Sequence, residues 1–345
     1  MKIALADYCC NSDKHDKPIG HRIKVANQYS EMIREYSVVQ HYIYEKHNEF
    51  LKINSNLSYG LPYCIYVNSK SRLVNIIKKL INIKLIFENN KCDIIWFYCP
   101  DFILYFYLAF FGNTSKKIVV TVFRNYAKGK MKKRIIQKAY DKIDAFICSN
   151  PNFLHRDIQS LYMPDYFYNK KENINSIHKE EVVICVGTMN KKKKLLECIE
   201  LFSYNEYPIK IMGYFYDNEF YEKLMLLKTK NVIIENRYLN DQEYKEQMMR
   251  AKYTILPYDA TFYKERTSGV LVESLFYNCI PICHNSILDF NEIQGIGYSE
   301  LIDLKNYNFY NDVSELYEKY NQLKSTTYSK KKNEKNLREM FESLE

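Results

Sequence analysis

The sequence predicts an α/β protein built from two doubly wound parallel-sheet domains, and three observations support that prediction. Short apolar runs typical of buried strands alternate with segments of helical periodicity along the chain. Two such runs in the second half end in glycine, which suits a tight turn from a strand into a helix. The length of 345 residues exceeds what one core usually supports, so two domains are expected.

In the first half, residues 2–8 read as the opening strand, and a polar loop ending at Gly20 leads into a helical pattern. Further strands are expected at 93–98, 117–122 and 144–149. These segments predict one Rossmann-like domain over residues 1–165. The polar, turn-rich stretch that follows predicts a linker over 166–180.

The second half repeats the alternation and predicts another Rossmann-like domain over 181–323. Helical patterns begin near residues 195 and 244. Strands are expected at 181–187, 207–213, 231–235 and 253–258. The charged segment 324–345 is expected to form a C-terminal helix that crosses back to the first domain, and a frayed tail is the competing interpretation.

The composition excludes several classes of protein. A mean hydropathy of −0.42 excludes a polytopic membrane protein. The apolar run Phe102–Phe111 is too short to cross a bilayer and is expected to be a buried helix. The ten cysteines show no disulfide or zinc spacing, and Cys279, Cys283 and His284 read as part of a buried strand. No export signal is predicted, because Asp7 interrupts the first apolar run, so a cytoplasmic protein is expected.

One stretch carries most of the functional information: Glu265-Arg-Thr-Ser-Gly-Val-Leu-Val-Glu273, which follows a predicted strand. Ser268 and Gly269 would lie at a helix start, where free N–H groups and the helix dipole favour a phosphate. Glu273 follows one turn later on the same helix face, where its carboxylate can accept hydrogen bonds from sugar hydroxyls. These residues predict a pocket for a nucleoside diphosphate that carries a sugar. A surface loop followed by an amphipathic helix is the competing interpretation.

This segment resembles the Glu-x7-Glu signature of retaining glycosyltransferases of the GT-B fold, in particular the large family 4 with its bacterial polysaccharide enzymes. The resemblance implies that Glu273 binds the donor ribose and that Glu265, the candidate catalytic residue, lies near the donor sugar. The amides of Ser268, Gly269 and Val270 would hold the diphosphate. It also implies two Rossmann-like domains that face each other across a cleft, with the donor in the second and the acceptor in the first.

Other donor-side positions follow from the same resemblance. Gly187 matches the glycine after the first strand of the donor domain, and Lys193 matches a lysine that neutralises the diphosphate. Thr188 stands where the family commonly has an arginine, so half of the expected charge clamp is missing. Tyr238 is a candidate to stack on the nucleobase. A solvated helix entrance for the lysines at 191–194, and simple packing for Tyr238, are the competing interpretations.

On the acceptor side, Gly20 and His21 occupy the place of a glycine-containing loop that approaches the acceptor and the donor phosphate in the family. Arg124 follows the strand at 117–122, where many family members carry a histidine. The resemblance therefore suggests that Arg124 binds the acceptor or the sugar instead. An ordinary turn is the competing interpretation of Gly20.

A basic cluster between residues 116 and 142 accompanies the formal net charge of +9. Asp141 and Asp144 arrive only at its end. Such a cluster suits anionic lipid headgroups, and a lipid-linked sugar acceptor would account for it. A solvated helix and a nucleic-acid surface are the competing interpretations, but no RNA-binding or helix-turn-helix motif supports the latter.

The sequence therefore predicts a glycosyltransferase that moves a sugar from a nucleoside-diphosphate sugar to a glycan or lipid-linked acceptor, with retention implied by the resemblance. No Asp-x-Asp motif appears at a suitable place, so neither a metal nor another cofactor is expected, and no nucleic-acid partner is expected. We expect the protein in the cytoplasm and, where the basic cluster meets lipid, on the inner face of the membrane. A nucleotide-sugar epimerase of the same fold and a catalytically degenerate binding protein are the alternatives.

Overall fold

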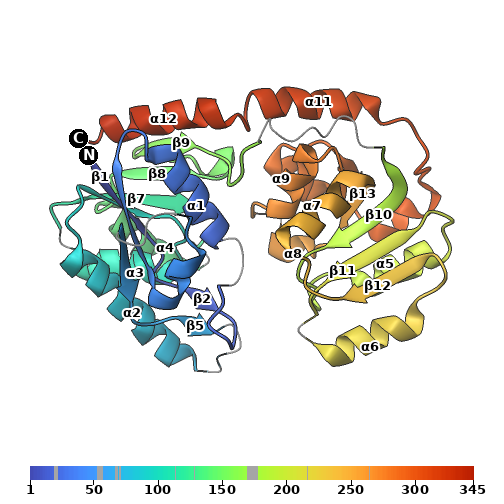
Figure 1. The fold of residues 1–345 in the computed structure, drawn as a ribbon, viewed down its shortest axis with the longest axis horizontal. Coiled ribbons are helices and arrows are strands. Elements are labelled where there is room, and N and C mark those ends of the chain that lie inside the picture. Colours follow the sequence, from blue (N-terminus) through green and yellow to red (C-terminus); the bar gives the residue numbers. More distant parts are fainter. Residues whose placement is uncertain are drawn as a thin grey trace. The chain divides into compact units, whose positions relative to one another are not determined.

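The computed structural model describes residues 1–18, 22–52, 57–66, 69, 71–112, 114–127, 129–168, 178–215, 217–263 and 265–345. Most of the expected linker, at 169–177, lies outside the described residues. The chain divides into two compact units (Figure 1): unit 1 comprises Met1–Asp165 and Lys330–Glu345, and unit 2 comprises Tyr166–Ser329. Each unit contains a parallel sheet with helices packed on it, so the predicted fold class of two doubly wound sheets is confirmed.

Unit 1, over its described residues, is built on a seven-stranded parallel sheet in the order β4-β3-β1-β6-β7-β8-β9. Its strands are β1 (Lys2–Ala6), β3 (Val38–Tyr44), β4 (Ser58–Leu61), β6 (Ile94–Phe97), β7 (Lys117–Val122), β8 (Ala145–Cys148) and β9 (Gln159–Tyr162). The chain first extends the sheet from β1 toward β4, and from β6 onward it extends the sheet in the opposite direction. The topological switch point of unit 1 therefore lies between β1 and β6.

Helices cover both faces of this sheet. They are α1 (Arg22–Ile33), α2 (Arg72–Asn89), α3 (Phe102–Phe111), α4 (Lys130–Tyr140) and α12 (Lys330–Glu342), with 3-10 turns η1 (Glu45–Phe50) and η3 (Pro151–Phe153) and a ladder of β2 (Asn11–Ser12) with β5 (Ile65–Tyr66). Ile83 of α2, Leu104 of α3 and Ile136 of α4 share one core with Ala4 and Ile95 of the sheet. These three helices therefore bury their inward faces on the same side.

The other face of the sheet is covered by α1 and α12. The Tyr29 ring of α1 stacks on Trp96 of β6, with the ring centroids 4.5 Å apart. The Phe341 ring of α12 lies 5.6 Å from the same Trp96 ring. The Met1 ammonium lies 3.6 Å from Oε1 of Glu345. The last described segment of the chain thus completes a core that the first segment begins.

Unit 2, within the part that the structure describes, contains a six-stranded parallel sheet in the order β12-β11-β10-β13-β14-β15. Its strands are β10 (Glu180–Val186), β11 (Ile209–Gly213), β12 (Val232–Asn236), β13 (Ala251–Leu256), β14 (Ile280–His284) and β15 (Ile296–Tyr298). Its helices are α5 (Leu195–Ser203), α6 (Asn218–Leu227), α7 (Asp241–Arg250), α8 (Ala260–Tyr263), α9 (Gly269–Phe276), α10 (Asn285–Asn291) and α11 (Ser314–Ser325), with a 3-10 turn η5 (Leu301–Asn306). The switch point lies between β10 and β13, where the direction of strand addition reverses.

Two helix starts in unit 2 follow directly from local sequence. A capping box opens α7: Asn240 Oδ1 accepts from the Glu243 N–H at 2.9 Å, and the Glu243 carboxylate accepts from the Asn240 N–H at 3.0 Å. Ser268 is the N-cap of α9, and its Oγ accepts from the Leu271 N–H at 3.4 Å. The helix start expected at Ser268 and Gly269 is therefore observed.

Two expectations about single elements need correction. The strand expected at 253–258 is β13 at Ala251–Leu256, because Pro257 has no N–H with which to continue the ladder. The helix expected to be buried at Phe102–Phe111 does form, but Phe110 and Phe111 are 51% and 61% exposed. Only one side of α3 therefore packs against the sheet.

The cysteines form no disulfide or metal site among the described residues. All ten cysteines are buried free thiols, and Cys283 lies in β14. His284 caps α10, since its Nδ1 accepts from the Ser286 N–H at 3.1 Å. Among the helices described here, none is both long enough and apolar enough to cross a bilayer.

Candidate functional site

The carboxyl edge of the unit 2 sheet brings the loops after β10, β11 and β13 together. The Lys194 N–H donates to Pro257 O at 2.8 Å, and the Met189 N–H donates to Tyr214 O at 3.0 Å. The loop at 187–194 therefore lies between the segment that follows β13 and the turn that follows β11. This edge contains the switch point of unit 2, which is where doubly wound sheets bind their ligands.

Glycine is required where two of these loops meet. Gly187 has a φ of +96°, and Gly213 has a φ of +158°. A Cβ added to Gly213 would lie 1.8 Å from Gly187 O, which no side chain allows. The two strand-ending glycines of the sequence thus let the β10 and β11 turns lie against each other. Thr188, the next residue, is exposed at this edge.

Lys193 differs from its neighbours because its side chain is buried. It is 7% exposed, whereas Lys191, Lys192 and Lys194 are exposed. Its Nζ donates to Val186 O, at the end of β10, at 3.2 Å. Burial lowers the pKa of Lys193, and the nearby titratable groups that oppose this effect are thiols.

The Lys193 ammonium has a setting that suits a bound anion. Its further contacts are Met189 Sδ at 3.7 Å and the ring of Tyr258, whose centroid is 5.8 Å away. Among the described residues, no carboxylate forms an ion pair with it. A buried cation without a counter-charge is costly for the fold, and a bound anion would offset that cost. The solvated-helix interpretation therefore fits the other three lysines of the run and not Lys193.

Tyr258 connects this ammonium with the start of α9. Its backbone pairs with that of Lys193 in an antiparallel bridge, and its hydroxyl lies 3.3 Å from Ser268 Oγ. Helix geometry leaves the N–H groups of Gly269 and Val270 without an intrahelical acceptor. The positive end of the α9 dipole and the Lys193 ammonium thus both lie near Tyr258.

Glu273 is buried in α9, one turn after Gly269. The Tyr244 hydroxyl of α7 donates to its Oε2 at 2.9 Å. Burial, followed by the charge of Glu273, raises the pKa of Tyr244, so the phenol stays a neutral hydrogen-bond donor. The sequence gives no local sign of this contact, because Tyr244 is an ordinary helix position and lies 29 residues from its partner.

Two further predicted residues lie in exposed loops. Glu265 is exposed in the turn ahead of α9. Tyr238 is exposed in the loop after β12, and the N–H of its neighbour Arg237 donates to Gly213 O at 3.1 Å. The loop with Tyr238 therefore lies beside the β11 turn. Within the described part of the chain, no hydrogen bond or ion pair joins Glu265 or Tyr238 to Lys193.

The predicted acceptor-side residues are only partly described. Gly20 and His21 lie outside the described residues. Arg124 follows β7, with its guanidinium carbon 4.8 Å from the centroid of the Tyr126 ring. The Tyr126 hydroxyl donates to Pro100 O at 2.6 Å. Arg124 therefore lies at the carboxyl edge of the unit 1 sheet, close to the segment that follows β6.

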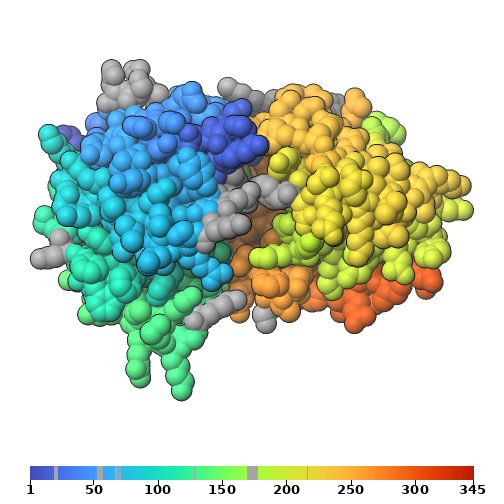
Figure 2. Space-filling model, turned by 90° about the horizontal axis from the view of Figure 1, so that it is seen from below, coloured from blue at the N-terminus to red at the C-terminus, as the bar shows by residue number. Residues whose placement is uncertain are grey.

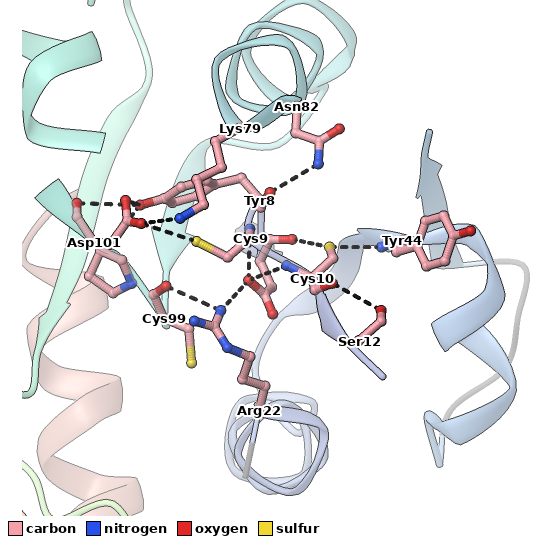
Figure 3. Close-up of polar contacts among 12 residues, drawn as sticks. Tyr8, Cys9, Cys10, Ser12, Arg22, Tyr44, Lys79, Asn82, Cys99 and Asp101 are labelled. Carbon is pink, nitrogen blue, oxygen red and sulfur yellow. Dashed lines mark hydrogen bonds and ion pairs between the residues drawn. The ribbon is translucent and has the colours of Figure 1, made fainter. Parts of the chain in front are cut away.

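A partly buried polar cluster that the sequence did not single out occupies the switch point of unit 1 (Figure 3). Asp7 follows β1 and is buried, and its Oδ1 accepts from Arg22 Nη1 at 2.6 Å and from the Cys9 N–H at 3.0 Å. Arg22 also donates to Cys99 O, beyond the end of β6, at 3.4 Å. The guanidinium thereby joins the two strands on either side of the switch point.

Asp101 forms the second half of this cluster. Its carboxylate accepts from the Tyr8 hydroxyl at 2.8 Å and pairs with Lys79 of α2, and it caps α3 through the Ile103 N–H at 2.9 Å. Burial alone would raise the pKa of Asp101, but Lys79 and these hydrogen bonds hold it below the usual value. In the sequence, Asp7 and Asp101 are visible only as interruptions of apolar runs. Their places after two predicted strands are the signal that could identify them.

No protein-family model matches the chain, and no curated protein matches it in sequence. Solved structures are nevertheless similar to it. Anabaena HepE in complex with UDP and glucose aligns with a TM-score of 0.68 and 11% identity over 99% of this chain and 100% of that one. The UDP-forming α,α-trehalose-phosphate synthase of Burkholderia vietnamiensis aligns with a TM-score of 0.63 and 8% identity, over 99% of this chain and 98% of that one. AviGT4, a glycosyltransferase involved in avilamycin A biosynthesis, aligns with a TM-score of 0.59 and 10% identity, over 99% of this chain and 97% of that one.

Identities this low establish similarity of fold. Each alignment covers nearly the whole of both chains, so the likeness extends over both parallel sheets. It is therefore the two-domain architecture, and not one Rossmann-like unit alone, that is shared. The protein has the fold of GT-B glycosyltransferases.

Proposed function

We propose that this protein is a glycosyltransferase that takes a sugar from a nucleoside-diphosphate sugar and transfers it to a glycan or lipid-linked acceptor. The observation that carries the proposal is the buried Lys193 ammonium at the switch point of unit 2, which Tyr258 connects with the N-terminus of α9. A diphosphate is a group that both features would stabilise. The similarly folded HepE in complex with UDP and glucose supports a nucleotide sugar as the ligand.

The donor would occupy this edge in a defined order. The diphosphate would contact Lys193 and the α9 amides, while Glu273 would accept hydrogen bonds from the ribose hydroxyls. Tyr238 would stack on the nucleobase, because its loop lies beside the β11 turn. The remaining proposed contacts are those of the loop after β10 and of the helix start: Gly187, Thr188, Ser268, Gly269 and Val270.

In the reaction, the bond between the anomeric carbon and the diphosphate oxygen breaks, and its electron pair leaves with the diphosphate. The acceptor hydroxyl oxygen forms the new bond to the anomeric carbon and gives up its proton to the departing diphosphate. Lys193 and the helix dipole would stabilise the departing charge, so this step is proposed to need no metal ion. Glu265 is proposed as the catalytic residue that faces the positive charge developing on the sugar. Retention of configuration is proposed from the sequence resemblance.

The acceptor is proposed to bind at the carboxyl edge of unit 1. This edge carries Arg124 and the Asp7–Arg22 and Lys79–Asp101 pairs at the switch point of that sheet. We also propose that the protein works in the cytoplasm, with part of it at the inner face of the membrane. Such a location would give it access to a lipid-linked acceptor and to cytoplasmic nucleotide sugars.

A thermal-shift panel of UDP, GDP, CDP and their sugars tests the donor proposal first. A ligand that binds the folded state raises the melting temperature, so one nucleoside diphosphate and its sugar should stand out. Hydrolysis of that sugar nucleotide, followed by product analysis, then tests for transfer. If no nucleotide shifts the melting temperature of the folded protein, the proposal is wrong.

The two alternatives appear as separate outcomes of the same assay. Nucleotide binding without hydrolysis or transfer would identify a binding protein, an outcome that the exposed Thr188 in place of the family's arginine would favour. Conversion of one free nucleotide sugar into its epimer would identify an epimerase.

A further inference from the structure

The outward face of α3 is apolar although it is open to solvent. The helix Phe102–Phe111 contains no charged residue, and its last two residues are each more than half exposed. The Phe106 ring lies 5.0 Å from the Phe110 ring and 6.4 Å from the Phe111 ring, so the exposed end is an aromatic cluster. A helix on a solvated surface normally presents polar side chains on this side.

The outward face of α2 shows the same departure. Five of its aliphatic residues are between 36% and 68% exposed: Leu73, Val74, Ile76, Ile77 and Ile81. A spacing of four residues places Leu73, Ile77 and Ile81 on one side of the helix. Ile83 and Ile86, on the other side, are buried in the core. The helix is therefore apolar toward solvent over its first half and apolar toward the sheet over its second half.

These faces adjoin one another. The Phe87 ring of α2 stacks on Tyr107 of α3 with centroids 5.4 Å apart, and Lys132 Nζ of α4 lies 5.2 Å from the Phe102 centroid. In Figure 2 the surfaces of α2, α3 and α4, coloured light blue, teal and green, adjoin on unit 1. We call the exposed apolar residues of α2 and α3, together with the exposed basic residues of α4, the α2–α4 band.

Positive charge borders the apolar part of the band. In α4, Lys130, Lys132, Lys133 and Arg134 are exposed, and so is Met131 among them. Lys138 Nζ lies 4.5 Å from the centroid of the exposed Phe110 ring. Neither α3 nor α4, both wholly described, contains an acidic residue. The band thus combines uncovered aromatic and aliphatic groups with a cationic edge.

We propose that the α2–α4 band docks unit 1 on an anionic phospholipid bilayer. The aromatic and aliphatic side chains enter the boundary between headgroups and acyl chains, and the α4 cations contact anionic headgroups. A second copy of the chain on a two-fold axis would bring the two basic α4 helices toward each other, and the like charges would repel. A nucleic acid would match the cations and leave the exposed aromatic groups uncovered.

This surface belongs to unit 1, so the inference does not depend on the proposed donor site in unit 2. It adds one point that does rest on the proposed function. Lys79, on the same helix as the exposed Leu73 and Ile77, pairs with Asp101 in the polar cluster at the unit 1 switch point. A helix in contact with lipid would therefore also border the place proposed for a lipid-linked acceptor.

The test is co-sedimentation of the full chain with phosphatidylcholine vesicles, with and without phosphatidylglycerol, in the absence of nucleotide. The wild type should sediment with the phosphatidylglycerol vesicles. High salt should release it only in part, because screening removes the charge attraction and leaves the apolar contact. Wild type that fails to bind at low salt would overturn the proposal.

Two pairs of substitutions separate the apolar contribution from the charge. Leu73→Ser with Ile77→Ser, and separately Phe110→Ser with Phe111→Ser, should each lower the vesicle partition coefficient about tenfold or more. Lys133→Gln with Arg134→Gln should weaken binding at low salt and change it little at high salt. Leu226→Ser, at an 87% exposed position of α6 in unit 2, is the matched control and should bind as the wild type does.

Three readouts keep the outcomes distinct. Unchanged binding by both serine pairs would show a purely electrostatic contact and refute insertion. A wild-type dimer that Leu73→Ser with Ile77→Ser converts to a monomer, without vesicle binding, would make the band a subunit interface instead. The nucleotide-induced thermal shift should be the same in all variants, so loss of lipid binding and failure of the donor proposal cannot be confused.

Discussion

The Tyr244 hydroxyl of α7 donates a hydrogen bond to Glu273 Oε2 of α9 across 2.9 Å. Glu273 is buried and Tyr244 is half-buried, so the bond fixes the position of one carboxylate oxygen in a setting where a misplaced charge would be costly. If Glu273 binds the donor ribose, Tyr244 is the residue that positions it. This hydrogen bond can therefore be removed by substitution without changing any residue that is proposed to contact the nucleotide.

The substitution Tyr244→Phe keeps the aromatic ring and removes the hydroxyl that donates the hydrogen bond to Glu273. We expect nucleotide affinity, measured by titration calorimetry, to fall by about 1–1.5 kcal/mol, in the range of a single hydrogen bond. Combined with Glu273→Gln, its effect should be smaller than the sum of the two single effects, because both variants break the same contact. Strictly additive effects would show that Tyr244 does not act through Glu273.

Glu273→Ala should weaken nucleotide binding by about 1.5–3 kcal/mol, the cost of losing a hydrogen bond to a charged group. Glu222→Ala, an exposed position of α6, provides the control and should leave affinity unchanged. Circular dichroism should confirm that both variants fold. A folded Glu273→Ala variant with wild-type affinity would exclude this residue from the site.

Glu265→Gln should lower kcat and leave the dissociation constant of the nucleoside diphosphate nearly unchanged. The physical reason is that a group facing the developing positive charge acts in the transition state and contributes little to ground-state binding. Steady-state kinetics with the best donor, alongside calorimetry with the free nucleotide, measures both quantities. Full turnover by this variant would contradict the catalytic role.

Lys193→Met should have opposite effects on stability and on binding. Without ligand, the free energy of unfolding in urea should stay equal or rise, because the variant removes a buried charge. Affinity for the nucleoside diphosphate should fall by about 1.5–3 kcal/mol, since a charge-assisted contact is lost. Lys194→Met, at the exposed neighbouring position, should change neither property greatly. Loss of stability together with unchanged nucleotide affinity would make Lys193 purely structural.

The pH dependence of stability should carry the signature of buried thiols. Burial raises the pKa of Cys148 from 9.0 to about 12, so between these pH values the folded state keeps a proton that the unfolded state has lost. The free energy of unfolding must therefore fall as pH rises through this window, by at most about 1.4 kcal/mol per pH unit for one group. Cys148→Ala should reduce that slope in urea titrations at successive pH values. An unchanged slope would mean that this thiol ionises alike in both states.

The parts of the fold that could be predicted from the sequence are those that depend on residues close together in the chain. Apolar runs with glycine or polar ends located the β7 and β10 strands to within a residue. The Ser268-Gly269 step located the start of α9, because an N-cap depends on neighbours within one turn. The prediction for α3 was right in place and wrong in burial, since a sequence with no polar face gives no sign of which side meets solvent.

Contacts between distant segments explain what the sequence could not show. The Tyr8–Asp101 and Arg22–Cys99 contacts depend on β1 and β6 lying side by side, and their sequence separations are 93 and 77. The burial of Lys193 among four consecutive lysines depends on the chain path around Tyr258. Residue type at these positions indicates charge, while the pairing of strands decides which charges meet.

Unit 1 contains the first segment of the chain to be synthesised, but it is complete only after unit 2 has been synthesised. Unit 2 is one continuous segment, Tyr166–Ser329, whereas unit 1 also needs Lys330–Glu345. All segments of unit 2 are therefore synthesised before α12, the helix whose Phe341 packs beside Trp96. Until then, the aromatic face of the N-terminal sheet is open to chaperones and to other nascent chains. The unit whose synthesis begins first is thus the one whose last segment is made last.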